Sequence, residues 1–298
     1  MTYHIALGNR AYSSWSLRAW LLLERFGLSR TATWIDFDAP LSTEEQLVEF
    51  APARTVPALR TRDGAILSES LAIAEYLAEQ HPDKHLLPVD PFKRAVSRNL
   101  AAEMHAGFIA LRTFCPMNLL VAYAPVDMPQ DVLDDLRRLE MIWQNARAST
   151  GSQTPWLCGD YSTADAFFAP VAARIAGYGL PVTKAARAYV EAHLSDPAFR
   201  RWRAMALANG KVLKRYERDY ATTTWPGPTP QPALAVAVSD AENTTCPYSG
   251  DPVTHFLELD GRVFGFCNAF CRDKTIADPE AWPAFTALRD APAETGVR

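Results

Sequence analysis

The stretch Tyr12-Ser13-Ser14-Trp15-Ser16-Leu17-Arg18 follows a short apolar strand predicted over residues 3–8 and opens a helix with apolar periodicity. Two further stretches follow, Thr55-Val56-Pro57-Ala58-Leu59 and Ser68-Glu69-Ser70-Leu71-Ala72-Ile73. Strands are predicted over residues 58–61 and 65–67, with the Asp63-Gly64 turn between them, and a helix over residues 70–80. This order and spacing predict one βαβαββα domain.

Together the three stretches resemble those of soluble glutathione transferases, in particular the serine-dependent, zeta-like branch and its bacterial relatives, over about residues 1–215. The resemblance implies an α+β or α/β fold with a thioredoxin-like, glutathione-binding domain over residues 1–82. An all-α transferase domain over residues 90–215 and a homodimer are also implied. The implied catalytic residues are Ser13 and Ser14. The residues implied to bind the co-substrate glutathione are Trp15, Ser16, Thr55, Val56, Pro57, Glu69 and Ser70.

A serine at a strand-to-helix junction has a chemical purpose in such an enzyme. A free thiol with a pKa near 8.5 must shift down by about two units to be mostly ionised at neutral pH, which corresponds to about 2.7 kcal/mol. A hydroxyl that donates to the thiolate contributes about 1.5 to 3 kcal/mol, and a helix N-terminus adds up to about 1 kcal/mol. Ser13 matches the thiolate-stabilising serine of the resembled family. Serines before a helix can also be a simple N-cap, and the motif alone leaves both interpretations open.

The other two stretches suit the peptide part of glutathione. X-Pro bonds adopt the cis form more readily than others, and a cis bond before Pro57 would let Val56 offer both its backbone N–H and C=O to an extended peptide. Ser70 and Glu69, at the start of a helix, can together hold the α-carboxylate and α-amine of the γ-glutamyl group. A turn proline and a serine N-cap are the simpler alternatives.

Composition indicates an intracellular enzyme. The chain has 298 residues, 48% hydrophobic residues and a net charge of −4, so it can bury a large core and has no basic excess for nucleic acid. The first residues do not show the charged leader and apolar run of a signal peptide, and no apolar stretch is long enough to span a membrane. The sequence therefore predicts a cytoplasmic protein without a membrane span. Cys115 and Cys158 lie in apolar surroundings and are expected to be buried thiols.

From about Asp90 the periodicity predicts helices only. One long or kinked helix is predicted over residues 91–122, broken near Cys115-Pro116, and further helices over residues 130–148, 184–193 and 196–208. Ser162-Thr163-Ala164-Asp165 is a capping box that resembles the buried folding signature of transferase C-domains.

The first of these helices is expected to line a pocket for the electrophile. The predicted pocket residues on one of its faces are Met104, His105, Phe108, Ile109 and Arg112. Arg112 could hold a carboxylate or an oxyanion, although a lone helical His or Arg is often only structural. Trp15 stands where the zeta class usually has a cysteine, so isomerase activity does not carry over directly. Conjugation, isomerisation and a reductive glutathione reaction stay open.

The C-terminal part differs from an ordinary transferase. Residues 216–240 include Trp225-Pro226-Gly227-Pro228-Thr229-Pro230-Gln231-Pro232 and are predicted to be a stiff linker. Residues 241–298 carry Cys246 in a turn, strands predicted over 253–259 and 262–266 around Asp260-Gly261, and Cys267 and Cys271 on a helix.

This cysteine spacing resembles the TRASH or YHS type of metal-binding module, a relative of the treble clef, and predicts one bound metal, most simply zinc. Ser249 stands where another cysteine would complete the set, so the fourth ligand could be His255, Asp251 or water. A metal-free hairpin and helix is the alternative, and a disulfide is a further one.

The sequence therefore predicts a glutathione transferase that activates the thiol through serine and attacks a small hydrophobic or carboxylate-bearing electrophile. The alternatives are a glutathione-dependent isomerase and a catalytically weak, transferase-like scaffold that binds or senses metal through its C-terminal module. The intact Ser13 and Ser14 favour the enzyme, whereas the cysteine module favours the metal-binding scaffold.

Overall fold

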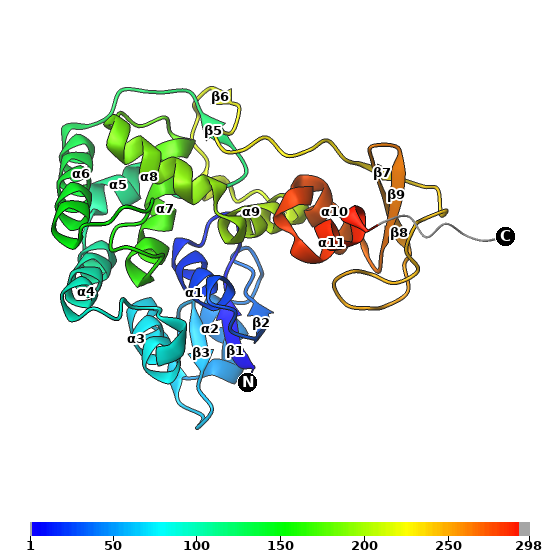
Figure 1. Ribbon diagram of the computed structural model, residues 1–298, viewed down its shortest axis with the longest axis horizontal. Helices are drawn as coiled ribbons and strands as arrows, with labels where there is room; N and C mark the ends of the chain where they lie inside the picture. Colours follow the sequence, from blue (N-terminus) through cyan, green and yellow to red (C-terminus); the bar gives the residue numbers. More distant parts are fainter. Residues whose placement is uncertain (1, 292–298) are drawn as a thin grey trace. The chain divides into compact units, whose positions relative to one another are not determined.

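The computed structural model describes residues 2–291 of the 298-residue chain. It divides into two compact units, which Figure 1 shows with their elements labelled. Unit 1 comprises the described residues up to Asp196 together with Val212–Gly227. Unit 2 comprises Pro197–Lys211 together with the described residues from Pro228 onward.

The elements of unit 1 are β1 (Tyr3–Leu7), α1 (Ser14–Arg25), β2 (Arg30–Trp34), α2 (Thr43–Gln46), β3 (Ala58–Arg60), β4 (Ile66–Leu67), α3 (Ser70–Gln80), α4 (Pro91–Ala106), α5 (Ile109–Phe114), β5 (Ala122–Tyr123), α6 (Gln130–Thr150), α7 (Thr163–Gly177), α8 (Lys184–Ser195) and β6 (Thr222–Thr223). The elements of unit 2 are α9 (Pro197–Asn209), β7 (Leu234–Val236), β8 (His255–Leu259), β9 (Arg262–Phe266), α10 (Ala269–Ala277) and α11 (Pro283–Asp290). None of the helices in the described part of the chain has the length and apolar character that crossing a bilayer requires.

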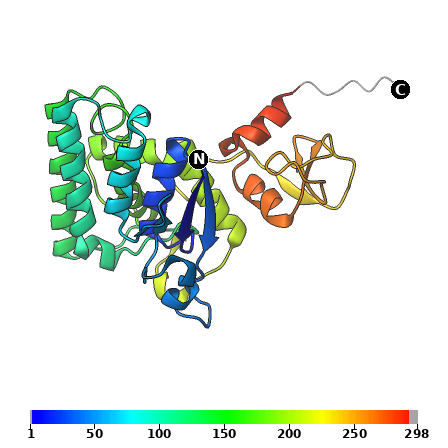
Figure 2. The same cartoon turned by 90° about the horizontal axis from the view of Figure 1, so that it is seen from below.

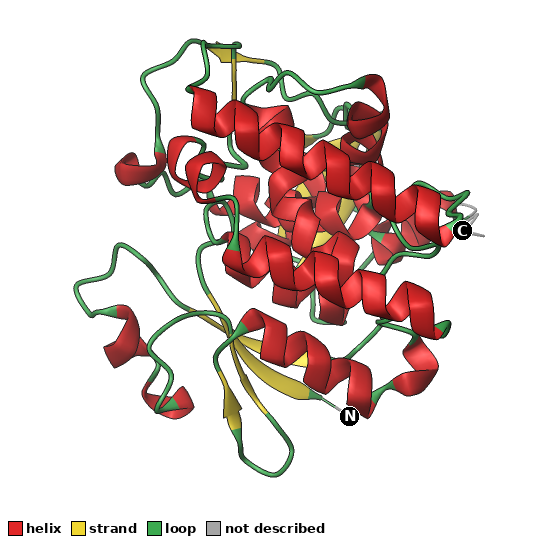
Figure 3. Ribbon diagram, turned by 90° about the vertical axis from the view of Figure 1, so that its left-hand side faces the viewer, coloured by secondary structure: helices red, strands yellow, loops and turns green. Residues whose placement is uncertain are grey.

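The N-terminal sheet confirms the predicted βαβαββα order. Its strand order is β2-β1-β3-β4, with β1 parallel to β2 and the other pairs antiparallel. Figure 3 draws the strands in yellow and the helices in red. Because β1 has a neighbour on each side, Ile5, Ala6 and Leu7 are all fully buried. Helix α1 packs against both α3 and α7, so it is buried on nearly every side. This packing fixes the start of α1, and with it Ser13 and Ser14, between α3 and α7.

Helix α7 forms the centre of the helical domain, because almost all of its residues are buried and it packs against α1, α4 and α8. The predicted capping box at its start is confirmed. The Asp165 carboxylate, which has no exposed surface, accepts hydrogen bonds from the Ser162 N–H at 2.9 Å and the Leu157 N–H at 3.1 Å. It also accepts from the Tyr189 hydroxyl at 2.9 Å, so one buried side chain joins three segments.

The predicted helix over residues 91–122 is wrong in its extent. Helix α4 ends at Ala106, where the Gly107 N–H donates to the Glu103 carbonyl at 2.8 Å. Phe108 then takes a left-handed backbone conformation, with φ of 59°, and its side chain is buried. Burial of this ring, next to a glycine that readily ends a helix, separates α4 from α5. The break predicted near Cys115 coincides with the end of α5, and residues 122–123 form strand β5.

Unit 2 contains a small antiparallel sheet with the order β7-β8-β9, drawn in yellow and orange in Figure 2 beside its helices. The predicted hairpin is confirmed, since Asp260 and Gly261 join β8 to β9 with φ of 53° and 75°. Positive φ at both positions is the requirement of the tight hairpin turn that Asp-Gly favours. The buried core residues of this unit include Leu257, Leu259, Phe264, Phe266 and Phe285.

Two features of unit 2 could not be expected from the sequence. Helix α9 packs along α10, and its Arg200 guanidinium donates to both carboxylate oxygens of Asp278, at 2.8 and 2.6 Å. Strand β7 lies inside the segment predicted as a linker, residues 216–240. The division into residues 1–82, 90–215, 216–240 and 241–298 stays a prediction.

Candidate functional site

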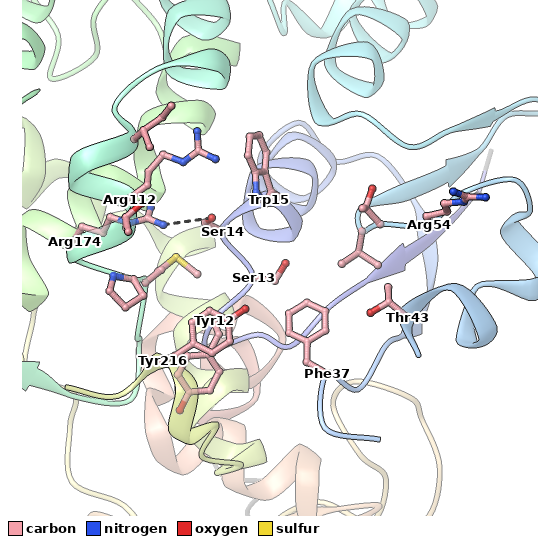
Figure 4. Close-up of a pocket in the computed structure, with 16 residues that line it drawn as sticks. Tyr12, Ser13, Ser14, Trp15, Phe37, Thr43, Arg54, Arg112, Arg174 and Tyr216 are labelled. Atoms are coloured by element: carbon pink, nitrogen blue, oxygen red, sulfur yellow. Dashed lines mark hydrogen bonds between the residues drawn. The ribbon is translucent and has the colours of Figure 1, made fainter. Parts of the chain in front are cut away.

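A cavity of about 450 Å³ lies beside the start of α1 in unit 1. Its lining residues are Tyr12, Ser13, Ser14, Trp15, Phe37, Thr43, Arg54, Thr55, Val56, Ile109, Arg112, Thr113, Pro116, Met117, Arg174 and Tyr216. Figure 4 shows Arg112 and Arg174 on one side of the cavity and Thr43 and Arg54 on the other. Three arginines and no Asp or Glu stand among these lining residues, so the cavity favours an anionic occupant.

Ser13 is both the N-cap of α1 and a wall of the cavity. Its position is fixed by its own N–H, which donates to the Asn9 carbonyl at 2.8 Å. The Ser13 Oγ accepts from the Ser16 N–H at 3.3 Å and donates to the Ser16 Oγ at 2.8 Å. The two interpretations of this serine are therefore compatible, because the hydroxyl that caps the helix also lies at its N-terminus beside the cavity.

Arg174 reaches the cavity from α7, a helix that is otherwise almost wholly apolar. Its Nε donates to the Cys115 carbonyl at 2.8 Å and its Nη1 to the Pro170 carbonyl at 3.2 Å. Its Nη2 lies 3.5 Å from the Ser14 Oγ. Burial lowers the pKa of Arg174 to about 10, helped by the positive charge of Arg112, so the guanidinium stays charged at neutral pH.

Trp15, in the first turn of α1, lies against two cationic side chains. The guanidinium of Arg18 lies 4.4 Å from the centre of the Trp15 ring, and that of Arg112 lies 4.8 Å from it. Arg18 is buried, and its Nε and Nη1 have no hydrogen-bond partner among the described residues. Stacking on the indole therefore stabilises these two charges in place of a carboxylate.

His105 lies behind this group rather than in the cavity. Its ring packs edge-on against Trp15 at 5.1 Å, and its Nε2 lies 3.6 Å from the Glu69 Oε2. Burial and the charge of Arg18 lower its pKa, while Glu69 raises it, and the net shift is downward. The imidazole is thus predominantly neutral at pH 7.

The predicted electrophile pocket is brought together only in part. Arg112 and Ile109 line the cavity. Met104, on the buried face of α4, and Phe108, at the break after α4, are 0% and 6% exposed, and neither lines the cavity.

The stretch around Pro57 lies on the opposite wall. The Val56–Pro57 peptide bond is cis, and Thr55 and Val56 line the cavity. Within the described residues, no hydrogen bond uses the backbone N–H or C=O of Val56. Both groups are thus available to an extended peptide.

Glu69 and Ser70 stand at the N-terminus of α3, as predicted, but outside the lining of the cavity. The Ser70 side chain is 1% exposed, and its Oγ has no hydrogen-bond partner in the described part of the chain. Ser16 is not brought to the cavity at all. Its fully buried Oγ accepts from the Gly8 N–H at 2.8 Å and thereby joins α1 to the end of β1.

Several side chains of the cavity could not be identified from the sequence. Tyr12 and Tyr216 stack with ring centres 4.9 Å apart, and the Tyr12 hydroxyl accepts from the Leu213 N–H at 3.2 Å. Phe37, Met117 and Arg174 were also not identified. A single arginine inside the apolar run of α7 was a usable signal, since a buried charge needs a specific reason.

In unit 2, the three predicted cysteines come together. The sulfur atoms of Cys246, Cys267 and Cys271 all lie within 4.8 Å of one another, with 3.9 Å between those of Cys267 and Cys271. All three are free thiols, so the alternative of a disulfide is wrong. Burial raises the pKa of Cys246, but hydrogen bonds from the backbone of Cys267, Tyr248 and Ser249 outweigh it and bring the pKa to about 7.

A family model described as "Glutathione S-transferase, N-terminal domain" matches residues 12–80. The glutathione S-transferase GstA of Escherichia coli O157:H7 is 30% identical over 160 residues, which cover 51% of this chain and 73% of that relative. This chain belongs to the glutathione S-transferase family. The chain also resembles a solved glutathione transferase homologue from Burkholderia gl BGR1 with bound glutathione, at 25% identity. That match has a TM-score of 0.52 and covers 70% of this chain and 99% of the other, which supports the thioredoxin-like fold with a helical C-terminal domain.

Other relatives of the transferase carry a more specific name. A probable maleylacetoacetate isomerase of Caenorhabditis elegans is 33% identical over 138 residues, covering 45% of this chain and 62% of that protein. The maleylacetoacetate isomerase of Rattus norvegicus is 34% identical over 103 residues, which cover 35% of this chain and 47% of that protein. The transferase thus spans between about half and three fifths of the isomerases it matches.

Proposed function

We propose that this transferase binds glutathione as its co-substrate and that Ser13 stabilises the thiolate for attack on a small, carboxylate-bearing electrophile. The observation that carries this proposal is the cavity itself, where Ser13, at the N-terminus of α1, faces the same space as Arg112 and Arg174. A thiolate at a helix N-terminus gains from the free N–H groups of the first turn. A carboxylate on the second substrate would offset the two arginine charges.

The thiolate is proposed to take over a hydrogen bond that Ser13 now makes inside the protein. The Ser13 hydroxyl donates to the Ser16 Oγ, and Ser16 keeps a second donor, the Gly8 N–H, when that bond is lost. Turning the hydroxyl toward sulfur therefore leaves no buried acceptor unsatisfied. The new bond, to a charged acceptor, is worth about 1.5 to 3 kcal/mol.

The peptide part of glutathione is assigned to the opposite wall and to α3. Val56 is proposed to pair with the cysteinyl backbone, and Ser70 and Glu69 to hold the γ-glutamyl end. The Ser70 Oγ supports this, because a buried hydroxyl without a partner, at a helix N-terminus, is a suitable donor for a carboxylate. Trp15 and Thr55 complete the proposed contacts through their places in the wall.

Replacing Glu69 or Ser70 by alanine is expected to raise the KM for glutathione about tenfold or more while kcat falls less, because both act far from sulfur and bind ground and transition states alike. Glu79→Ala is the control, since Glu79 is an exposed acid on the same helix. Steady-state kinetics at varied glutathione concentration test this. An unchanged KM in both variants would mean that α3 does not bind the peptide.

The substrate class is tested through Arg112, which lines the cavity and whose own bonds, to the Gly107 and His105 carbonyls, are long at 3.2 and 3.4 Å. Arg112→Gln is expected to lower kcat/KM for a carboxylate-bearing electrophile by about tenfold to a hundredfold, the loss of one charge-assisted bond. For a neutral electrophile, the kcat/KM of Arg112→Gln should fall little. Arg54→Gln is the matched control, because Arg54 lines the same cavity but pairs with Glu44 at 3.2 Å in an exposed position. Equal losses for charged and neutral electrophiles would contradict the assignment.

Conjugation and isomerisation both begin with addition of the thiolate to an activated carbon, and the two arginines suit either reaction. We place the chain in the zeta-like branch, and the names of its isomerase relatives favour isomerisation. Trp15 in the place of the usual cysteine favours conjugation. Mass spectrometry of the product separates them, because a conjugate retains glutathione and an isomer does not.

We propose a second function for unit 2, a TRASH-like or YHS-like, treble-clef-related module that binds zinc through Cys246, Cys267 and Cys271. Zn–S bonds of about 2.3 Å in tetrahedral geometry place sulfur atoms about 3.8 Å apart, and the Cys267–Cys271 separation of 3.9 Å fits that arrangement. When bound, such an ion cross-links the turn, the hairpin and α10. The alternative of a catalytically weak metal-sensing scaffold rests on this same cluster.

Removing the metal with a chelator, or replacing Cys271 by serine, is expected to make the segment beyond about residue 235 at least several-fold more sensitive to protease, because metal binding supplies folding free energy to a small module. Conjugating activity should be largely kept. Limited proteolysis with Cys158→Ser as a control cysteine variant tests this. If the purified protein contains no stoichiometric metal and unit 2 is equally protected from protease before and after chelation, the metal site is wrong. Unit 2 is then a metal-free hairpin and helix.

We further propose that the transferase is a homodimer of the cytoplasm. Exposed apolar side chains near the start of α4, Val89 at 66% and Phe92 at 57%, suit an interface between subunits. All five cysteines are free thiols, which a reducing compartment maintains.

A further inference from the structure

The cysteine cluster offers three ligands for a metal ion, and the structure shows which side chains lie near the fourth coordination position. Among the His, Cys, Asp and Glu side chains of the described residues, only those of Cys246, Cys267 and Cys271 converge there. His255, a predicted fourth ligand, is not part of this cluster, and its Nδ1 lies 2.9 Å from the Thr254 Oγ1. Asp251, the other candidate, is likewise outside the cluster. Both expectations are therefore wrong.

Ser249 is the side chain beside the cluster. Its Oγ donates to the Cys267 sulfur at 3.3 Å and accepts from the Asp251 N–H at 3.3 Å. Asn268 also donates to this sulfur, through its Nδ2 at 3.2 Å. Two neutral donors thus surround Cys267 where a further thiolate would stand. Their hydrogen bonds orient a metal ligand without adding one to the set.

This side of the cluster is also its open side. Cys246 is buried and the other two cysteines are partly buried, whereas Ser249 and Asn268 are exposed. Structural zinc sites are closed by four protein ligands, while sites with three protein ligands keep a position for a water or an exchangeable ligand. A neutral serine hydroxyl does not replace a thiolate, because soft metals select sulfur.

We propose that the fourth coordination position of this site is open, because Ser249 stands there in place of a thiolate, so that a bound metal ion would take a small thiol such as glutathione as its fourth ligand. This inference rests on the proposed metal site. In that step the thiol would lose its proton to solvent and its sulfur would replace a water, with no change of oxidation state. Sulfur suits the open position because the other three ligands already select a thiophilic ion.

The experiment is a Co²⁺ titration of the full-length, metal-free protein, followed by the thiolate-to-cobalt absorption. Ser249→Cys is expected to raise this absorption by about one third, since four thiolates replace three. Adding glutathione should change the spectrum of the wild-type protein and leave that of Ser249→Cys unchanged. In competition with a chelating dye, Ser249→Cys should hold Zn²⁺ at least tenfold more tightly. Ser249→Ala is the control and should respond to glutathione as the wild type does.

The outcomes separate the two proposals. Absence of cobalt binding in both the wild type and Ser249→Cys would overturn the metal site itself. Binding by the wild type with a spectrum that glutathione does not change, or loss of binding in Ser249→Ala, would show a site closed by the protein and overturn only the open position. Circular dichroism verifies that each variant is folded, and the glutathione titration of the wild type stands even where Ser249→Cys fails to fold.

Discussion

Replacing Ser13 by alanine is expected to lower the kcat of the proposed reaction at neutral pH by about one to two powers of ten, the kinetic equivalent of about 1.5 to 3 kcal/mol. In the proposed role, the hydroxyl would bond the thiolate more strongly than the thiol, so its loss should raise the pKa of bound glutathione. The KM for glutathione should change little, because the peptide contacts remain. The pH profile is the sharper measurement, since the variant should regain activity as pH rises toward about 8.5, the pKa of a free thiol.

Two neighbouring serines serve as controls for Ser13. Ser14 also lines the cavity, but its Oγ makes a long contact with Arg174, at 3.5 Å, so Ser14→Ala should cost much less activity. Ser16→Ala leaves the Gly8 N–H without its acceptor, so any loss of activity there should come with a loss of thermal stability. Full activity in Ser13→Ala, with a loss in Ser14→Ala, would shift the catalytic assignment by one residue.

Asp165→Ala is expected to destabilise the protein by about 3 to 5 kcal/mol, because it leaves several buried donors without an acceptor. These donors are the N–H groups of Leu157 and Ser162 and the hydroxyl of Tyr189. A loss of this size lowers Tm by about 10 °C in a unit of about 200 residues. Urea unfolding measures the change in the free energy of unfolding. The control is Asp160→Ala, because Asp160 is an exposed acid in the same loop, and its free energy of unfolding should stay within about 0.5 kcal/mol of wild type. A loss below about 1 kcal/mol would contradict the role of Asp165.

The same carboxylate gives a pH dependence of defined sign. Burial raises the pKa of Asp165 to about 6, although its hydrogen bonds act in the opposite direction. Between about pH 4 and pH 6 the unfolded chain releases this proton and the native protein keeps it, so this group reduces stability as pH rises through that window. Above pH 6 its effect is constant. The difference in unfolding free energy between wild type and Asp165→Asn, measured across that range, isolates this contribution.

Much of the fold follows from local sequence signals. The apolar strand β1, the Asp260-Gly261 turn and the capping box at Ser162 each depend on residues close together in the chain, so their structures could be predicted. The position of Ser13 at the end of a strand and the start of a helix is local in the same sense. The break at Phe108 was missed, because it depends on burial of a ring by distant residues.

The sequence by itself determined which residues could supply the chemistry: serines at a helix N-terminus, a cis proline, and three cysteines around a hairpin. Tertiary structure alone decided which of them meet. It turned the Ser16 hydroxyl toward β1, brought Arg174 from α7 to Ser14, and left Ser249 rather than a fourth ligand beside the cysteine cluster. The physical reason is that side-chain direction depends on packing between segments far apart in the chain, whereas helix, turn and cap formation depend on neighbours within a few residues.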